Sequence, residues 1–297
     1  MMQIRYYTLF VFLKCLSFLS LNCLYLLSDL LYLVMYYIIR YRRKVVFANL
    51  LKSFPEITEK SRKAIAKKFY KHLCDCIVED IKLLHISKEE LGRRINVLNA
   101  ELIESLAKDG KSIIVLLGHY GNWEWVQEVT NHYCQPYINA EIYRPAKSLV
   151  FNKVLSRMRS RFSTMQIEQK QAVRTLLRLH NEGKQFLVGF ISDQRPNSKN
   201  LNHWLEFLNQ ETAIAIGGED IGNHIDAHFV YLDIEKPKRG YYAFTFKEIH
   251  PINDDKEFPI TRAFFTMFEK TIRREPAYWL WSHKRWRFSR KTNHIIK

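Results

Sequence analysis

One histidine and one glutamate, five positions apart, are the residues of this sequence best suited to chemistry. His119 follows an apolar run at 112–117, and Glu124 comes shortly after Gly121 and Asn122. On a continuous helix of 3.6 residues per turn, this spacing would turn the two side chains apart by about 140°. A glycine-bearing loop would instead let His119 fold back toward Glu124. A carboxylate that binds an imidazole fixes its tautomer and raises its basicity, so the pair predicts a general base.

The elements around this pair predict where it lies in the fold. The run at 112–117 has the composition of a buried strand, and Asn122 fits the N-cap of a following helix. Glu124 would then lie in the first helical turn, where the helix dipole favours its anionic form. Ligands of open α/β sheets bind at the carboxyl ends of strands, which is where His119 falls. The alternative is a histidine satisfied within a loop and a glutamate that only caps a helix.

No second motif supplies a nucleophile, a metal or a cofactor. The sequence lacks G-x-S-x-G, H-E-x-x-H, G-x-G-x-x-G and a phosphate-binding loop ending in G-K-[ST]. The cysteines, at positions 15, 23, 74, 76 and 134, form no C-x-x-C pair, so we expect reduced thiols and neither a disulfide framework nor a zinc site. We therefore expect direct activation of an acceptor hydroxyl by the histidine, with no metal and no cofactor.

Other charged residues are candidates for the same site. Asp193 ends an apolar run at 186–192, so it would point into the same crevice as His119 if the two strands are parallel. The alternative for Asp193 is a turn aspartate at a strand end. Arg144 and Arg159 are candidates for contact with a phosphate or an oxyanion, because a guanidinium group matches both geometrically. The alternative for each arginine is a solvated surface position.

The pattern along the chain predicts a layered α/β domain. An amphipathic helix is expected over 53–84, with an apolar residue at every fourth position from Ile65 to Ile81. Short apolar runs that resemble buried strands then alternate with helical stretches. The expected strands are 112–117, 137–142, 186–192, 228–234 and 241–249. This alternation indicates one α/β domain over 41–297, with a mixed, largely parallel sheet flanked by helices.

Residues 1–40 are predicted to anchor the chain in a membrane. Residues 6–39 contain only two charges, Lys14 and Asp29, and four basic residues follow between 40 and 44. By the positive-inside rule, a span that ends near residue 39 would place the remaining chain in the cytoplasm. Asp29 would cost a few kcal/mol at the middle of the bilayer. A helix that lies in the interface, with Asp29 on its wet face, is therefore the alternative to a transmembrane helix.

The formal net charge of +16 is concentrated near the two ends of the chain. Residues 40–71 carry 11 basic and two acidic side chains, and residues 262–297 carry ten and two. Such bands suggest anionic partners, whether nucleic acid, phospholipid headgroups or an acidic carrier protein, although solvated helix faces produce the same pattern. Trp279, Trp281 and Trp286, next to His283, Lys284 and Arg285, are interpreted as an aromatic and basic interface patch or in part as core.

With these residues, the sequence resembles the late acyltransferases of lipid A biosynthesis, the lauroyl/myristoyl transferase family. The mark of that family is an H-x4-D/E motif, which glycerolipid acyltransferases share, and which here extends from His119 to Glu124. The resemblance continues over most of the chain after the membrane helix. The matching segments are YRRKVVFANLLKSFPE, GHYGNWEW, YRP at 143–145, RMRSRF at 157–162, SDQRP at 192–196 and PAYWLWSHKRW.

The resemblance implies transfer of a fatty acyl chain from an acyl carrier protein or coenzyme A thioester to a hydroxyl of a phosphorylated lipid A precursor, in lipopolysaccharide biosynthesis. It implies a glycerolipid acyltransferase-like fold at the inner membrane, with the catalytic domain facing the cytoplasm. His119 would be the base and Glu124 would orient it, with support from Arg159 and Asp193. Substrate would be bound by Gly121, Asn122, Arg144 and Gln194.

Differences from the family pattern keep other functions open. FLNQ at 207–210 and GGED at 217–220 replace the usual FLGQ and G-P-E segments. The acceptor lipid is therefore not fixed, and a glycerophospholipid or an aminoacyl lipid is the alternative. From other classes, the rivals are a membrane-tethered nucleic-acid-binding protein, which would use the charge and the aromatic residues, and a non-catalytic membrane scaffold.

Overall fold

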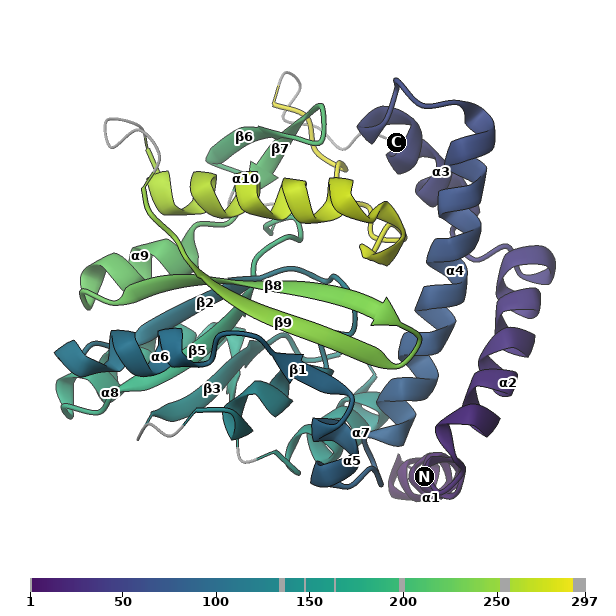
Figure 1. Cartoon of the computed structure of the whole chain (residues 1–297), viewed down its shortest axis with the longest axis horizontal. Coiled ribbons are helices and arrows are strands. Elements are labelled where there is room, and N and C mark those ends of the chain that lie inside the picture. The colour runs from purple at the N-terminus through teal and green to yellow at the C-terminus, as the bar shows by residue number, and fades with distance from the viewer. Residues whose placement is uncertain are drawn as a thin grey trace.

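A computed structural model describes residues 2–133, 137–146, 148–162, 164–197, 201–251 and 257–290. Cys134 and the C-terminal Lys291 and Lys297 lie outside these ranges. Within the described residues, seven strands form one sheet in the order β1-β9-β8-β2-β5-β3-β4 (Figure 1). The strands are β1 (Ile95–Val97), β2 (Ile113–Leu117), β3 (Ile138–Tyr143), β4 (Met165–Glu168), β5 (Phe186–Ile191), β8 (His228–Lys238) and β9 (Tyr241–Glu248).

The sheet is mixed and largely parallel, which confirms the predicted fold class. Neighbouring strands run parallel except β8 and β9, which form an antiparallel hairpin. Every residue of β2 is buried, because this central strand is covered on both faces, as is usual for parallel sheets. The five predicted strands all form. β1 and β4 were not predicted, since strands of three and four residues leave little periodicity to detect.

A separate hairpin, β6 (His203–Phe207) and β7 (Gln210–Ile214), was also missed. Its turn residues, Leu208 and Asn209, both have positive φ angles. A leucine is uncommon in that conformation, so the usual hairpin signal of asparagine or aspartate followed by glycine is absent.

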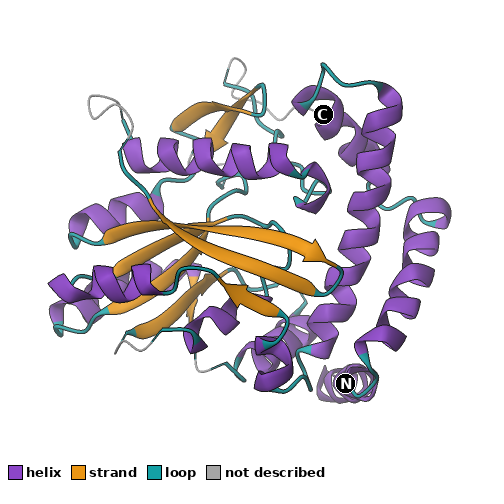
Figure 2. Cartoon of the chain, in the orientation of Figure 1, coloured by secondary structure: helices purple, strands orange, loops and turns teal. Residues whose placement is uncertain are grey.

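Helices surround the sheet, as Figure 2 shows. Long α4 stands at one end of the sheet, and α10 runs alongside the β8–β9 hairpin. The helices after the N-terminal region are α3 (Arg43–Ser53), α4 (Glu59–Lys82), α5 (Lys88–Gly92), α6 (Glu101–Leu106), α7 (Leu149–Arg159), α8 (Ala172–Asn181), α9 (Gly217–His224) and α10 (Pro259–Arg274). Short 3₁₀ turns are η2 (Ala107–Asp109), η3 (Trp125–Asn131), η4 (Gln169–Gln171) and η5 (Pro276–Tyr278).

The predicted helix over 53–84 is shorter than expected. α4 begins at Glu59, where the hydroxyl of the N-cap residue Thr58 accepts the N–H of Ser61. Its buried side is also more polar than the apolar stripe predicted, since Asp75, Glu79 and Lys82 are among its buried residues. The physical reason is that α4 has protein on two sides, with the sheet on one and α2 on the other (Figure 1).

The N-terminal segment forms two helices instead of one. α1 (Met2–Ser17) ends before Ser20, whose hydroxyl caps α2 (Leu21–Leu33), and a π-helical turn, η1 (Val34–Ile38), continues α2. By length and composition, Leu21–Ile38 is the one described segment that could cross a membrane, and a third of it is buried in the protein. α2 packs along α4, so it is joined to the folded domain.

Asp29 of α2 has a partner that the sequence did not reveal. Arg239, in the β8–β9 turn, donates from Nη2 to Oδ1 of Asp29 over 2.7 Å and also binds Asp75 of α4. A carboxylate that is paired with an arginine keeps this partner at a membrane surface, so the pairing reduces the cost of placing Asp29 there.

The aromatic segment near the C-terminus lies mostly in the core. Trp279 and Trp281 are buried, and their rings stack edge to face at 4.6 Å. Arg285 is also buried, so the alternative that part of this segment belongs to the core holds for these three residues, whereas Trp286 is only half-buried. The reason is that residues 276–281 run back against the loop after β2, where they join the interior of the protein.

Candidate functional site

His119 and Asp193 meet at the carboxyl ends of two neighbouring strands. In the parallel pair β2 and β5, Leu117 lies opposite Ile191, and each functional residue comes two positions later. The amide of Ser192 donates to the carbonyl of Leu117, which holds the two strand ends together. Nδ1 of His119 lies 2.6 Å from Oδ1 of Asp193. The expectation that Asp193 shares a crevice with His119 is therefore confirmed.

The contacts of this pair define the tautomer of the imidazole. An ionised carboxylate only accepts, so Nδ1 of His119 carries the proton, and Nε2 has the free lone pair. The side-chain amide of Gln194 lies 3.1 Å from Nε2 and donates to it. Nε2 is thus the basic atom, and Gln194 holds the position that an acceptor hydroxyl would take.

Asp193 is held as a carboxylate inside the protein. Its Oδ2 accepts the indole N–H of Trp279 over 2.7 Å, and only 2% of the residue is exposed. Burial alone would raise the pKa of Asp193, but the charge of His119 and the hydrogen bonds from His119 and Trp279 lower it below its ordinary value. The contact of Trp279 with Asp193 could not be predicted, because nothing in the linear sequence connects these two residues.

Glu124 is paired with Arg159 and not with His119, contrary to our prediction. Nε and Nη2 of Arg159, at the end of α7, donate to the two carboxylate oxygens of Glu124 over 2.9 and 2.6 Å. Among the described residues, the carboxylate that binds the imidazole is that of Asp193. A guanidinium fork matches both oxygens of a carboxylate at once, so Arg159 competes well for Glu124. Trp123 lies against the imidazole instead, with ring centroids 5.0 Å apart.

Further acidic side chains surround Arg159. Burial would lower the pKa of Arg159, but its hydrogen bonds and charge interaction with Glu124 raise it, so it stays charged. Burial raises the pKa of Glu141, a β3 residue 3.7 Å from Arg159, to about 7. Burial and the nearby Glu124 also raise the pKa of Asp80 well above its ordinary value. Besides Glu124, the arginine therefore faces two carboxyl groups, Glu141 and Asp80, whose raised pKa values disfavour ionisation.

The loop between His119 and Glu124 is occupied by contacts within the protein. The N–H of Gly121 donates to the carbonyl of Tyr278 over 3.0 Å, so this N–H is occupied within the protein and is not free to bind a substrate. Gly121 has a φ angle of +61°, and a Cβ there would lie 2.6 Å from Ile234, so only glycine fits.

Asn122 is buried and makes no contact suited to a substrate. Its Oδ1 accepts the N–H groups of Glu124 and Trp125, as expected of a cap, and its Nδ2 donates to Glu79. The segment that it caps is a 3₁₀ helix that begins at Trp125, with Glu124 just before it, and not the α-helix predicted. The polar atoms of the Asn122 side chain are therefore engaged within the protein.

A cluster of basic side chains lies beside the His119–Asp193 pair. Arg144 is exposed in the segment after β3, and it and Arg287 lie close enough to Arg195 to act on its charge. Burial lowers the pKa of Arg285 to about 10 and that of His283 to about 4, so His283 is neutral at pH 7. Nε and Nη2 of Arg285 are buried without a hydrogen-bond partner in the described part of the chain, while Nη1 donates to Ala213.

The acidic cluster offers no metal site. Among the residues that the structure describes, no group of three or more histidine, cysteine, aspartate or glutamate side chains is arranged to hold a metal ion.

Comparison with known proteins identifies the family of this chain. A search of solved structures found similarity to the 1-acyl-sn-glycerophosphate acyltransferase PlsC from Thermotoga maritima, with 13% identity, a TM-score of 0.38, and coverage of 84% of this chain and 97% of that one. No curated protein is significantly similar to this sequence. Residues 2–288 match the family model of the bacterial lipid A biosynthesis acyltransferases. This chain therefore belongs to the bacterial lipid A biosynthesis acyltransferase family.

Proposed function

We propose that this protein transfers a fatty acyl chain from an acyl carrier protein thioester to a hydroxyl of a phosphorylated lipid A precursor. Family membership supports acyl transfer to a lipid, and the residues at the strand ends support the chemistry. The observation that carries the proposal is the His119–Asp193 pair, which leaves Nε2 of His119 as a base at the mouth of the sheet. Coenzyme A is the alternative carrier of the acyl group.

His119 is the general base of the proposed reaction. The acceptor hydroxyl replaces the amide of Gln194 at Nε2, and it loses its proton to that nitrogen as its oxygen attacks the thioester carbonyl. The imidazolium that forms is stabilised by Asp193, as in other histidine–carboxylate pairs. When the tetrahedral intermediate collapses, the C–S bond breaks, and the imidazolium returns the proton to the departing thiolate. No acyl group is attached to the protein at any step.

Arg159 is the proposed donor to the oxyanion of the tetrahedral intermediate. It is held by Glu124 and remains charged, so its position does not depend on substrate. A fixed donor of this kind lowers the barrier because it needs no reorganisation when charge develops. Glu124 then acts through Arg159, in place of the direct contact with His119 that its spacing predicted.

The basic cluster beside the base is the proposed binding site for an anionic part of the substrates. Arg285 has buried N–H groups that lack partners among the described residues, and Arg144 is exposed next to Arg195. A phosphate group would satisfy such donors by bidentate contacts. Both the phosphorylated acceptor and the phosphopantetheine arm of the carrier protein offer one.

The N-terminal helices are the proposed attachment to the membrane. On α1 and α2 many large apolar side chains face outward, including Ile4, Val11, Leu26 and Leu30, each more than half exposed. The other side of α2 is packed on α4, so α2 cannot separate from the domain without breaking these contacts. We favour a position of α1 and α2 in the interface over a free transmembrane span, on the cytoplasmic side of the inner membrane.

The test is acyl transfer measured by mass spectrometry. Purified protein in detergent or vesicles is given acyl carrier protein thioester and, in separate reactions, a lipid A precursor, a lysophospholipid and an aminoacyl lipid. We expect transfer to the lipid A precursor and its loss in His119→Ala, with the melting temperature unchanged. Transfer to the lysophospholipid or the aminoacyl lipid alone would reassign the acceptor. Salt-sensitive RNA binding without transfer to any lipid would overturn the proposal.

A further inference from the structure

Glu79 is a buried carboxylate that the proposed reaction does not use. It lies on α4 and is fully buried. Its oxygens accept from three neutral groups, the hydroxyls of Tyr25 and Tyr242 over 2.9 and 2.7 Å and the amide of Asn122 over 2.9 Å. No lysine or arginine in the described residues forms an ion pair with Glu79. A buried carboxylate without a cationic partner is costly in stability, so hydrogen bonds alone must hold it.

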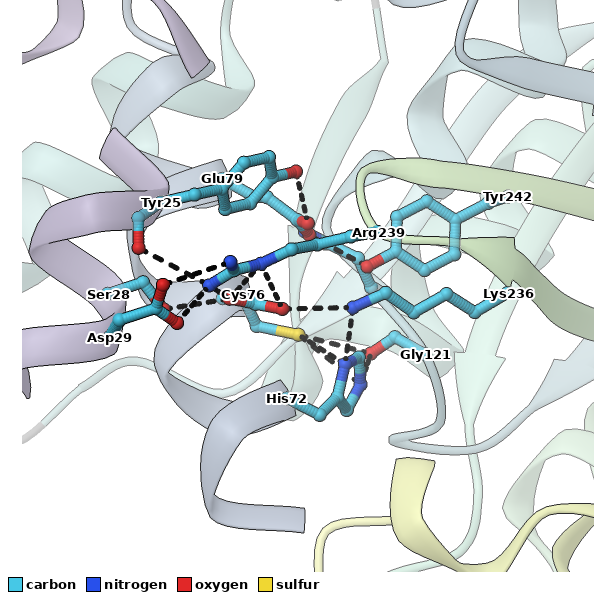
Figure 3. A network of polar contacts seen from close by, with 12 residues as sticks. Tyr25, Ser28, Asp29, His72, Cys76, Glu79, Gly121, Lys236, Arg239 and Tyr242 are labelled. Atoms are coloured by element: carbon cyan, nitrogen blue, oxygen red, sulfur yellow. Dashed lines mark hydrogen bonds and ion pairs between the residues drawn. The ribbon is translucent and has the colours of Figure 1, made fainter. Parts of the chain in front are cut away.

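The three donors come from elements that are distant in the sequence. Tyr25 lies on α2, Tyr242 on β9 and Asn122 in the loop between His119 and Glu124. Figure 3 shows the hydroxyl of Tyr25 directed at Glu79 from the N-terminal helix, with Tyr242 directed at the same carboxylate. The side chain of Glu79 therefore connects α2 with the loop between His119 and Glu124.

Asn122 extends this connection to the groups proposed for catalysis. While its Nδ2 is held by Glu79, its Oδ1 accepts the N–H groups of Glu124 and Trp125. Glu124 in turn holds Arg159 through two hydrogen bonds. A change at Glu79 would thus alter the hydrogen bond to the backbone of Glu124 through a single side chain, that of Asn122.

A second set of polar contacts connects α2 with the 119–124 loop, and it ends at Gly121, next to Asn122. Ser28 and Arg239 bind Asp75, and Lys236 binds both Asp75 and Nδ1 of His72 (Figure 3). Because an ammonium group can only donate, Nδ1 accepts, and Nε2 of His72 carries the proton that it donates to the carbonyl of Gly121 over 3.2 Å. Two routes from α2 therefore converge on Gly121 and Asn122.

We propose that Glu79 is a positioning residue that couples the seating of helix α2 to the geometry of the 119–124 loop, so that the enzyme is fully active only with Tyr25 docked on Glu79. The expected effect on kcat rests on the proposed acyl transfer, whereas the coupling between α2 and the 119–124 loop does not depend on that function. In this proposal, α2 both attaches the protein to the membrane and affects the rate of the reaction.

The decisive experiment is a double-mutant cycle between Tyr25→Phe and Asn122→Ala in the full-length protein. Tyr25→Phe removes one hydroxyl and keeps the ring. We expect it to lower kcat by roughly 3- to 10-fold with KM little changed, and to have less than about a 2-fold effect in the Asn122→Ala background. The matched control is Tyr137→Phe, which removes a buried tyrosine hydroxyl bound to the carbonyl of Lys111 at the other end of the sheet. The control should leave kcat unchanged.

Hydrogen exchange tests the coupling without an assay of activity. The amides of Glu124 and Trp125 are held by Asn122, so Tyr25→Phe should speed their exchange, and Tyr137→Phe should not. Faster exchange together with an inactive wild-type protein would support the coupling while overturning the proposed function. Unchanged exchange at 124–125, or additive effects on kcat in the cycle, would overturn the coupling even in an active enzyme.

Discussion

Nδ1 of His119 and Oδ1 of Asp193 are 2.6 Å apart because β2 and β5 are parallel and in register. The partner of the histidine is therefore 74 positions away in sequence, and the glutamate of its own motif binds an arginine instead. The predicted pair of His119 and Glu124 is therefore replaced by two pairs. In one, Asp193 orients His119, and in the other, Glu124 holds Arg159.

The first prediction concerns the orienting carboxylate. Asp193→Asn should lower kcat by about 10²- to 10⁴-fold, because an amide no longer selects the tautomer with a free Nε2 or stabilises the imidazolium. Steady-state kinetics and a melting curve are the measurements. Asp220→Asn, at an exposed position of α9, is the control and should behave as wild type. Retention of wild-type kcat by Asp193→Asn would return the orienting role to another residue.

The second prediction concerns the pair of Glu124 and Arg159. Glu124→Gln and Arg159→Met should each lower kcat, by about 10²- to 10³-fold if Arg159 binds the oxyanion. Because the two residues act as one unit, the double variant should be no worse than the more severe single one. Glu182→Gln, in an exposed ion pair with Lys184, is the control. Fully multiplicative effects would contradict a shared role and would favour a direct action of Glu124 on His119.

The third prediction uses the indole that binds Asp193. Trp279→Phe removes a hydrogen bond to a charged group, which is typically worth about 1.5–3 kcal/mol, and should lower kcat by roughly 10-fold or more. The same loss raises the pKa of Asp193. Since a depressed pKa contributes stability that is lost as pH falls through it, the variant should lose stability at a higher pH than wild type during acid unfolding. Trp204→Phe, which removes an indole hydrogen bond to the carbonyl of Leu201, should show neither change.

The fourth prediction follows from the raised pKa of Glu141. With a pKa of about 7 in the folded state and 4.5 as the ordinary value, the folded protein binds more protons between these limits. The free energy of unfolding should therefore fall as pH rises from about 4.5 to 7. Glu141→Gln removes this pH dependence. The free energy of unfolding of the variant minus that of wild type should therefore increase with pH, by at most ~3 kcal/mol, and level off above pH 7.

Urea unfolding at several pH values measures this difference. The exposed Glu206 provides the control, and Glu206→Gln should give a curve parallel to that of wild type. A curve for Glu141→Gln that is also parallel to wild type would mean that Glu141 ionises normally in the folded protein.

The fifth prediction concerns the outer face of α2. Replacement of Leu26 and Leu30 by serine should weaken binding to vesicles of anionic phospholipid, because burial of each leucine is worth about 1.5–3 kcal/mol. Both side chains are more than half exposed, so the melting temperature should change little. Serine at Leu98 and Val173, which are exposed to a similar extent, is the control. Equal flotation of all variants would place the membrane contact elsewhere.

Several features could be predicted from the linear sequence: the fold class, the main strands, the apolar N-terminal segment and the position of His119 at a strand end. These features depend on local periodicity and on the general behaviour of parallel sheets, which a linear pattern records. Glu124 and Asp193 could also be proposed as site residues, because charged side chains next to glycines or apolar strands are conspicuous in a sequence. Arg159 was proposed from the chemistry of its guanidinium group and from the resemblance to the family.

Which of these residues bind one another could not be predicted in the same way, because it depends on the folded arrangement of the chain. Spacing suggested that Glu124 would reach His119, but the ion pair of Glu124 with Arg159 depends on where α7 ends, and the contact of His119 with Asp193 depends on strand register. Glu79 and Trp279 were missed for the same reason, since each looks like an ordinary helix or core residue until its partners are known. Hydrogen bonds and ion pairs act over a few ångströms in space, so residues far apart in the sequence become partners only once the chain has folded.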